Sequence, residues 1–250
     1  MSLGKMNFGE ITPIWNPWVG CKEVSEACAN CYVLPHNHFS DNYVPFFGNY
    51  PEGTLVSVGL KTDFFLEEAD HLREQAWDTI RENKNLIFLI ITKRIDRVLN
   101  CLPDDWGSGY ENVIIAVTAE NQKMANLRIP ELIKLPAKHK WVTCSPLLEE
   151  VDLSQFLSSG EIEMVEVTGE RGIIFPARPT YFSWCESLSK QCKEYDIRFA
   201  LVYLGYNFIM PDGSVKQSHP RWYHNTLEDS LGLQYYKPLE FKLSNFTKIY

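Results

Sequence analysis

The chain has 250 residues, 45% hydrophobic and 22% charged, enough to bury one sizeable core and far more than a disulfide-stapled miniprotein has. Its 24 basic and 32 acidic residues give a formal net charge of −8, which argues against sequence-blind binding of phosphate backbones by the whole surface. No apolar run reaches the ~18 to 20 residues of a membrane helix and no secretory signal is recognised, so a cytoplasmic protein with no membrane partner is expected.

Short β-branched or aromatic runs alternate with polar, helix-compatible stretches along most of the chain. The runs begin ~23 to 35 residues apart, which is the length of one strand, one helix and two loops, so consecutive strands should be parallel and covered by helices. Helices are expected over 66–82 and 181–195, where apolar residues share one helical face. The expected strands are 54–60, 86–92, 113–118, 140–144, 163–168 and 198–204, with a further strand at 11–15.

This number of units exceeds that of a small flavodoxin-like sheet and predicts an α/β fold, a partial or open (β/α) barrel of parallel strands. Residues 1–205 are expected to form a single barrel-like domain that includes a cysteine loop at 15–32. The segment 206–250 changes character, and Met210-Pro211-Asp212-Gly213 is a turn signal between two short strands. We therefore predict a C-terminal hairpin and cap, an extension that packs on the barrel.

Polar residues follow the expected strands at the points where the strands end. In parallel α/β folds these carboxyl ends face one rim, so the polar side chains should converge on one cavity. The alternative is that each of them marks a loop and nothing more. The residues are Asp63, Lys93, Arg94, Glu120, Asn121, Ser145, Glu170 and Arg171.

The strongest local signal is a loop with three cysteines, Cys21, Cys28 and Cys31, spaced by six and then two residues. Thiolates on such a loop can bind a metal ion or an iron-sulfur cluster, and three cysteines on a four-iron cluster leave one iron open. A zinc site completed by His36 or His38, or inert buried thiols, are the alternatives. The four other cysteines are scattered over predicted strands and helices and are expected to be core thiols.

At this point the chain resembles a known family, the phage-associated three-cysteine-motif proteins, a domain of unknown function commonly grouped with radical S-adenosylmethionine (SAM) enzymes. The resemblance runs in order from about residue 11 to residue 205. The matching stretches include Trp15-Asn16-Pro17, Gly20-Cys21, Cys28, Asn30-Cys31-Tyr32, Thr62-Asp63, Thr92-Lys93-Arg94, Glu120-Asn121-Gln122, Arg128-Ile129-Pro130, Ser145-Pro146-Leu147-Leu148, Thr168-Gly169-Glu170 and Ala177-Arg178-Pro179.

The resemblance implies a partial barrel whose Cys21, Cys28 and Cys31 ligate a four-iron four-sulfur cluster, with SAM on the open iron. One electron from the reduced cluster would cleave SAM and release a 5′-deoxyadenosyl radical, with the protein supplying orientation and exclusion of water. The chain departs from the family pattern at Thr168 and Arg171, where the family carries small residues, and at Val202-Tyr203-Leu204-Gly205, where the family carries Lys-Gln-Trp-Gly. SAM is expected to bind side chains of the rim, namely Thr62, Asp63, Lys93, Arg94, Glu120, Asn121 and Glu170.

Two functions from different classes therefore stand side by side. The first is a radical SAM-type enzyme that receives electrons from a small flavodoxin- or ferredoxin-type protein and acts on an unidentified substrate, for which a nucleic acid or nucleotide is allowed. The second is a structural zinc- or cluster-containing binding or accessory protein of the phage type, without SAM chemistry. Iron, sulfide and zinc content separates the two.

Overall fold

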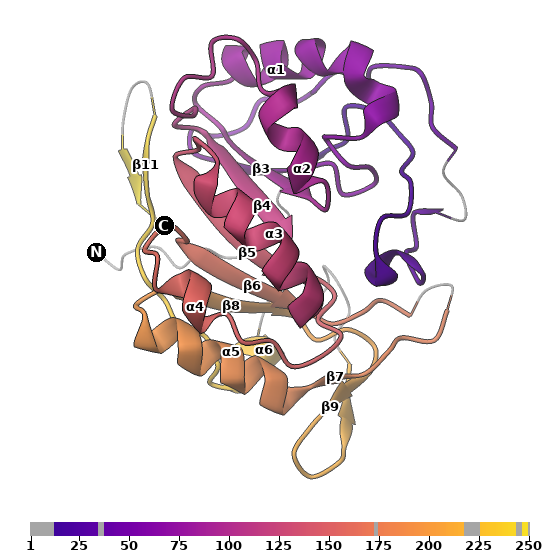
Figure 1. Ribbon diagram of the computed structural model, residues 1–250, viewed down its shortest axis with the longest axis vertical. Coiled ribbons are helices and arrows are strands. Elements are labelled where there is room, and N and C mark those ends of the chain that lie inside the picture. Colours follow the sequence, from indigo (N-terminus) through magenta and orange to yellow (C-terminus); the bar gives the residue numbers. More distant parts are fainter. Residues whose placement is uncertain (1–12, 35–37, 173–174, 218–225, 244–246, 250) are drawn as a thin grey trace.

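A computed structural model describes residues 13–34, 38–172, 175–217, 226–243 and 247–249. Seven parallel strands form one sheet in the order β1-β2-β3-β4-β5-β6-β8, curled into a half-barrel (Figure 1). This confirms the predicted α/β fold with a partial, open barrel. Residues 11 and 12 of the first expected strand lie outside the described residues. The strands are β1 Ile14–Trp15, β2 Leu55–Val58, β3 Ile87–Thr92, β4 Val113–Thr118, β5 His139–Cys144, β6 Met164–Thr168 and β8 Arg198–Tyr203.

Helices cover the outer face of this sheet (Figure 1). The segment expected to be helical at 66–82 is a 3-10 helix, Glu67–Leu72, followed by α1, Arg73–Glu82, and the one at 181–195 is α5, Phe182–Glu194. The others are α2 Ile95–Val98 with a 3-10 turn at Leu99–Cys101, α3 Gln122–Lys134 and α4 Ser154–Leu157. Their apolar faces and the outward side chains of the strands form the main core. No described helix has the length and apolar character needed to cross a membrane.

The central strands are buried on both faces, which explains why the run at β4 is apolar up to its last residue. Every residue of β4 and of β5 is buried, as expected for parallel strands with one face under helices and the other inside a barrel. A second, smaller core fills the inner face near the amino ends of the strands. It includes Leu89, Ala116, Trp141 and Met164 from the sheet and Phe241 from the C-terminal segment.

The C-terminal segment adds short strands around the barrel. The predicted hairpin at 210–213 is confirmed, since β9 (Phe208–Ile209) and β10 (Val215–Lys216) pair antiparallel and the Met210 amide donates to the Ser214 carbonyl at 2.8 Å. β7 (Thr180–Tyr181) pairs with β9. After α6 (Thr226–Ser230), Tyr235 forms an antiparallel bridge to Phe199 on β8, and β11 (Glu240–Lys242) pairs with β12 (Thr247–Ile249). Phe241 thus closes the amino end of the inner face.

Candidate functional site

A cavity of about 430 Å³ lies at the carboxyl ends of the strands, where the sequence predicts the site. Its lining combines all three cysteines of the loop with residues that end or follow β2, β3, β4, β5, β6 and β8. Of the rim residues predicted from the sequence, seven line it: Thr62, Asp63, Lys93, Arg94, Ser145, Glu170 and Arg171.

The cysteine loop enters the cavity through one short 3-10 helix, Glu26–Cys28, which buries Cys28. The Cys31 amide donates to the Cys28 carbonyl at 3.0 Å, so these two cysteines sit on one tight turn. Cys21 and Cys31 are half-buried. Gly20 has a φ of +107°, and a Cβ there would meet Phe39 Cα at 2.4 Å, so only glycine fits the turn before Cys21.

The three thiols line the same cavity without converging on one point. Within the described part of the chain, no group of three or more His, Cys, Asp or Glu side chains is placed to hold a single metal ion. His38 is exposed and does not line the cavity, and His36 lies outside the described residues. A four-iron cluster binds each thiolate through a different iron, so its ligands stand further apart than those of one ion. Three thiolates are a donor set that a cluster can take, and within the described residues no histidine joins them at the cavity.

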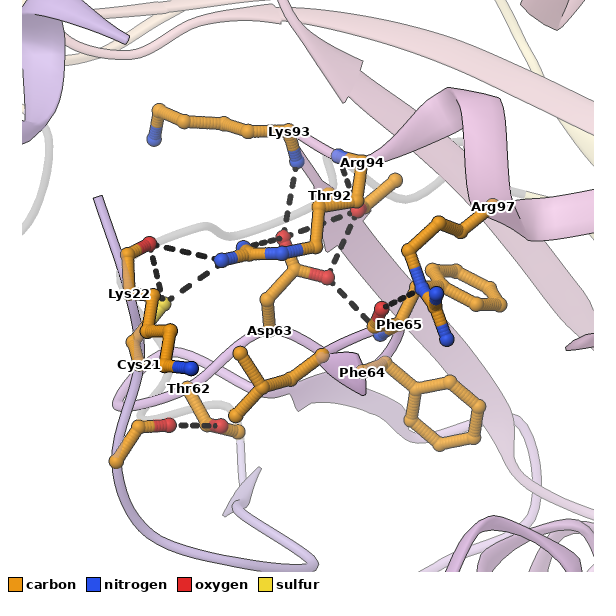
Figure 2. A network of polar contacts seen from close by, with 12 residues as sticks. Cys21, Lys22, Thr62, Asp63, Phe64, Phe65, Thr92, Lys93, Arg94 and Arg97 are labelled. Carbon is orange, nitrogen blue, oxygen red and sulfur yellow. Dashed lines mark hydrogen bonds and ion pairs between the residues drawn. The ribbon is translucent and has the colours of Figure 1, made fainter. Parts of the chain in front are cut away.

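Asp63 is the centre of a buried polar network after β2 and β3 (Figure 2). Its carboxylate accepts hydrogen bonds from the Thr92 hydroxyl at 2.8 and 3.0 Å and from the Lys93 and Phe65 amides at 3.1 and 2.9 Å. Arg94 Nη1 lies 3.2 Å from the same carboxylate, and both side chains are more than nine-tenths buried. The capacity of Asp63 to accept is thus met by its neighbours on two loops.

The same network reaches the cysteine loop through Arg94 and Thr62 (Figure 2). Arg94 Nη2 donates to the Lys22 carbonyl at 2.8 Å, and Nη1 lies 3.8 Å from Cys21 Sγ. The Thr62 hydroxyl donates to the Gly20 carbonyl at 2.5 Å. Burial raises the pKa of the Cys21 thiol, and the positive charge of Arg94 opposes that rise. Two residues at the ends of neighbouring strands therefore fix the position of the first cysteine.

Glu170, after β6, fixes the other end of the loop. It accepts from the Arg178 amide at 2.8 Å and Nε at 3.0 Å, and from Asn30 Nδ2 at 3.1 Å, next to Cys31. Arg178 Nη1 also donates to the Glu26 carbonyl at 3.2 Å. Burial raises the pKa of Glu170, but these hydrogen bonds outweigh it and hold the pKa below its ordinary value. Glu170 is therefore an ionised anchor for the turn that carries Cys28 and Cys31.

Glu120 and Asn121, after β4, do not line the cavity. Glu120 is fully buried, pairs with Arg128 Nη1 on α3 at 2.7 Å, and accepts a hydrogen bond from the Ser25 hydroxyl of the cysteine loop. Asn121 is the N-cap of α3, and its side chain accepts from the Met124 amide at 2.9 Å. The structure thus places Glu120 behind the loop and Asn121 at a helix end.

Lys93 and Ser145 do face the cavity. The Lys93 amide binds Asp63, while its side chain extends away from the network (Figure 2). The Ser145 hydroxyl lies 2.6 Å from the Thr168 hydroxyl across β5 and β6. Within the described residues, the Lys93 ammonium has no carboxylate partner, so it is available to an anionic ligand.

Several cavity residues were not predicted from the sequence. Thr118, Thr143 and Glu166 line it from within strands rather than from the loops after them, and Tyr203 lines it beside Arg171. Burial raises the pKa of Glu166 to about 7, and Arg198 opposes this rise. The available signal was a lone glutamate within an otherwise apolar buried strand, because an unpaired buried carboxyl is costly unless it has a function.

Comparison with known proteins adds the family. Proteins of curated function give no match, and solved structures give none either. Residues 5–219 match a family described only as protein of unknown function (DUF5131), a stretch that contains the cysteine loop and every strand of the half-barrel. The chain belongs to this family of proteins of unknown function.

Proposed function

We propose that this protein is a radical SAM-type enzyme in which Cys21, Cys28 and Cys31 hold a four-iron four-sulfur cluster and SAM occupies the adjoining cavity. The proposal includes a small flavodoxin- or ferredoxin-type electron donor, a cytoplasmic setting and an origin among phage-associated proteins. When bound and reduced, such a cluster supplies the electron that splits SAM into methionine and a 5′-deoxyadenosyl radical, which then takes a hydrogen atom from the substrate.

One observation carries the proposal: three thiols line a cavity at the carboxyl ends of parallel strands, and within the described residues no histidine lines it with them. The loop that bears them is anchored by side chains that follow four different strands: Thr62, Arg94, Glu120 and Glu170. A structural zinc site needs four ligands and no adjoining cavity. An incomplete ligand set beside a cavity is what a cluster with an open iron requires.

The residues around the loop then have two roles in this proposal. Asp63, Arg94, Glu120 and Glu170 hold the loop and have their hydrogen bonds satisfied by the protein, so they act as positioning residues. The Lys93 ammonium lines the cavity without a carboxylate partner among the described residues, and we assign it to bind the SAM carboxylate. Thr62 lines the cavity as well and keeps its hydroxyl oxygen as an acceptor for SAM.

The test is metal analysis of protein purified and reconstituted without oxygen. We expect iron and sulfide near four per chain, lost in the Cys21→Ala, Cys28→Ala, Cys31→Ala triple variant. Cys101→Ala is the matched control, because Cys101 is half-buried but does not line the cavity. SAM should alter the electron paramagnetic resonance spectrum of the reduced wild type. Zinc in place of iron, or a cluster that ignores SAM, would overturn the proposal.

A further inference from the structure

The floor of the cavity is a row of polar side chains inside the sheet. Thr118, Thr143 and Glu166 stand opposite one another on β4, β5 and β6, and all three line the cavity. Glu166 precedes Thr168 by two residues, which places it about 6 to 7 Å deeper along the strand than the rim. This row is separate from the side chains that anchor the cysteine loop.

Among the described residues, the Glu166 carboxyl has no hydrogen-bond or ion-pair partner, and the charge of Arg198 acts on it from further away. Only 8% of Glu166 is exposed, and no described residue donates a hydrogen bond to it or forms an ion pair with it. The facing residue on β8 is Ala200, and Arg198 stands one step deeper, opposite Met164, with its guanidinium 5.8 Å from the Tyr236 ring. A buried carboxyl without donors is costly, and a ligand that brings N–H groups to it removes that cost.

Two cations stand at the mouth of the same cavity. The Arg171 guanidinium lies over two tyrosine rings, 5.2 Å from the centroid of Tyr32 and 5.7 Å from that of Tyr203. Ring contacts engage the face of a guanidinium and leave its in-plane N–H donors available. Neither Arg171 nor Lys93 has a carboxylate partner among the described residues, whereas Arg94 and Arg178, which also stand beside the cavity, are paired. Arg171 and Lys93 are therefore available to an anionic group, and Glu228 is a carboxyl that lines the same cavity.

Aliphatic side chains line the cavity beside this row. Leu55, Leu89, Ile91 and Val202 line the cavity from β2, β3 and β8. Such walls suit the faces of a planar heterocycle, and a volume of about 430 Å³ lies within the range of small-molecule sites. A ligand with N–H donors for Glu166, an apolar planar part and an anionic group for Arg171 matches this lining.

We propose that this cavity binds a guanine nucleotide, with the base edge on Glu166 and the phosphate on Arg171. Guanine presents two adjacent N–H donors on its base-pairing edge, which match the two oxygens of one carboxylate, and enzymes read bases through such edges. The guanidinium of an arginine ligand has a similar edge, but Arg171, the mouth cation that is not assigned to SAM, favours a ligand with a phosphate. Binding itself does not depend on the cluster; only the status of the nucleotide as a substrate rests on the proposed function.

The test is calorimetric titration of the full chain, as purified, with GMP, guanosine, IMP and AMP. We expect GMP to bind at least tenfold more tightly than guanosine, which lacks phosphate, than IMP, which lacks the exocyclic amine, and than AMP. Glu166→Gln should weaken GMP binding at least tenfold. Arg171→Gln should abolish the preference for GMP over guanosine. Lys190→Gln, an exposed change on α5, is the control and should bind GMP like the wild type.

Three results would overturn the inference. The first is a Glu166→Gln variant, shown by its circular dichroism and melting temperature to be folded, that binds GMP as tightly as the wild type. The second is agmatine binding that needs Glu166 while phosphate contributes nothing, which would identify an arginine-type ligand. The third is SAM binding that itself needs Glu166, which would assign the floor to the cofactor. GMP binding in a protein that takes up no iron would leave this inference standing and overturn only the proposed enzyme.

Discussion

Arg94 connects Asp63 to Cys21: its Nη1 lies 3.2 Å from the Asp63 carboxylate and 3.8 Å from the Cys21 sulfur. The Arg94–Asp63 ion pair is buried between the end of β2 and the end of β3. The second terminal nitrogen of Arg94, Nη2, donates to the Lys22 carbonyl. A comparable connection runs from Glu170 through Asn30 to the turn before Cys31. The polar rim of the half-barrel therefore fixes the loop that carries the thiols.

The first prediction concerns this buried pair. Arg94→Met removes one partner and leaves the Asp63 carboxylate buried without its cation. We expect a loss of roughly 3 to 5 kcal/mol in the free energy of unfolding, measured by urea denaturation. Lys190→Met, which breaks an exposed pair on α5, should change it by less than about 0.5 kcal/mol. A loss below about 1 kcal/mol for Arg94→Met would show that the network adjusts without the guanidinium.

The second prediction concerns the Glu170 anchor. Glu170→Gln keeps an acceptor but loses the charge that binds Arg178, so the turn with Cys28 and Cys31 should open more often. We expect thiol labelling of Cys31, followed by peptide mass spectrometry, to become several-fold faster. Labelling of Cys101 in the same sample is the internal control, because Cys101 does not line this cavity. Equal rates for Cys31 in wild type and variant would rule out Glu170 as an anchor.

The strands and the position of the cavity could be predicted from the sequence because they depend on short-range patterns. The run 113–118 is apolar up to its last residue, Thr118, because β4 is buried on both faces. The hydrogen-bond and ion-pair partners of individual side chains could not be predicted, because those partners are distant in sequence. Glu120 pairs with Arg128 on α3 and with Ser25 on the loop, 95 residues away. Glu166 was not predicted because it lies within β6, and the sequence argument covers only polar residues that follow a strand.

Asn121 was predicted as a rim residue, but its side chain caps a helix. Its side chain caps α3 by accepting from the Met124 amide at 2.9 Å. Asn121→Ala should therefore lower the free energy of unfolding by about 1 kcal/mol, measured by urea denaturation, and leave iron content and nucleotide binding unchanged. Asn126→Ala, exposed on the same helix, should be neutral or slightly stabilising. A fall in ligand binding for Asn121→Ala at unchanged stability would instead give Asn121 a direct role.

The last prediction uses the pH dependence of stability to test the isolation of Glu166. Burial raises its pKa from 4.5 to about 7 in the folded chain, opposed by Arg198. Between these values the unfolded chain has released the proton that the folded chain retains, so the contribution of Glu166 to stability decreases as pH rises. The full change is roughly 3 kcal/mol.

Glu166→Gln cannot titrate, so the wild type should lose stability relative to this variant as pH rises from about 5 to about 8. The difference in free energy of unfolding between the two proteins removes the contributions of all other carboxyls. One of these is Glu170, whose folded pKa is lowered, so that its contribution changes with pH in the opposite direction. A difference that stays constant across this range would mean that Glu166 is already ionised in the folded chain. The carboxyl would then be stabilised by the protein, and the argument that it awaits the N–H groups of a ligand would fail.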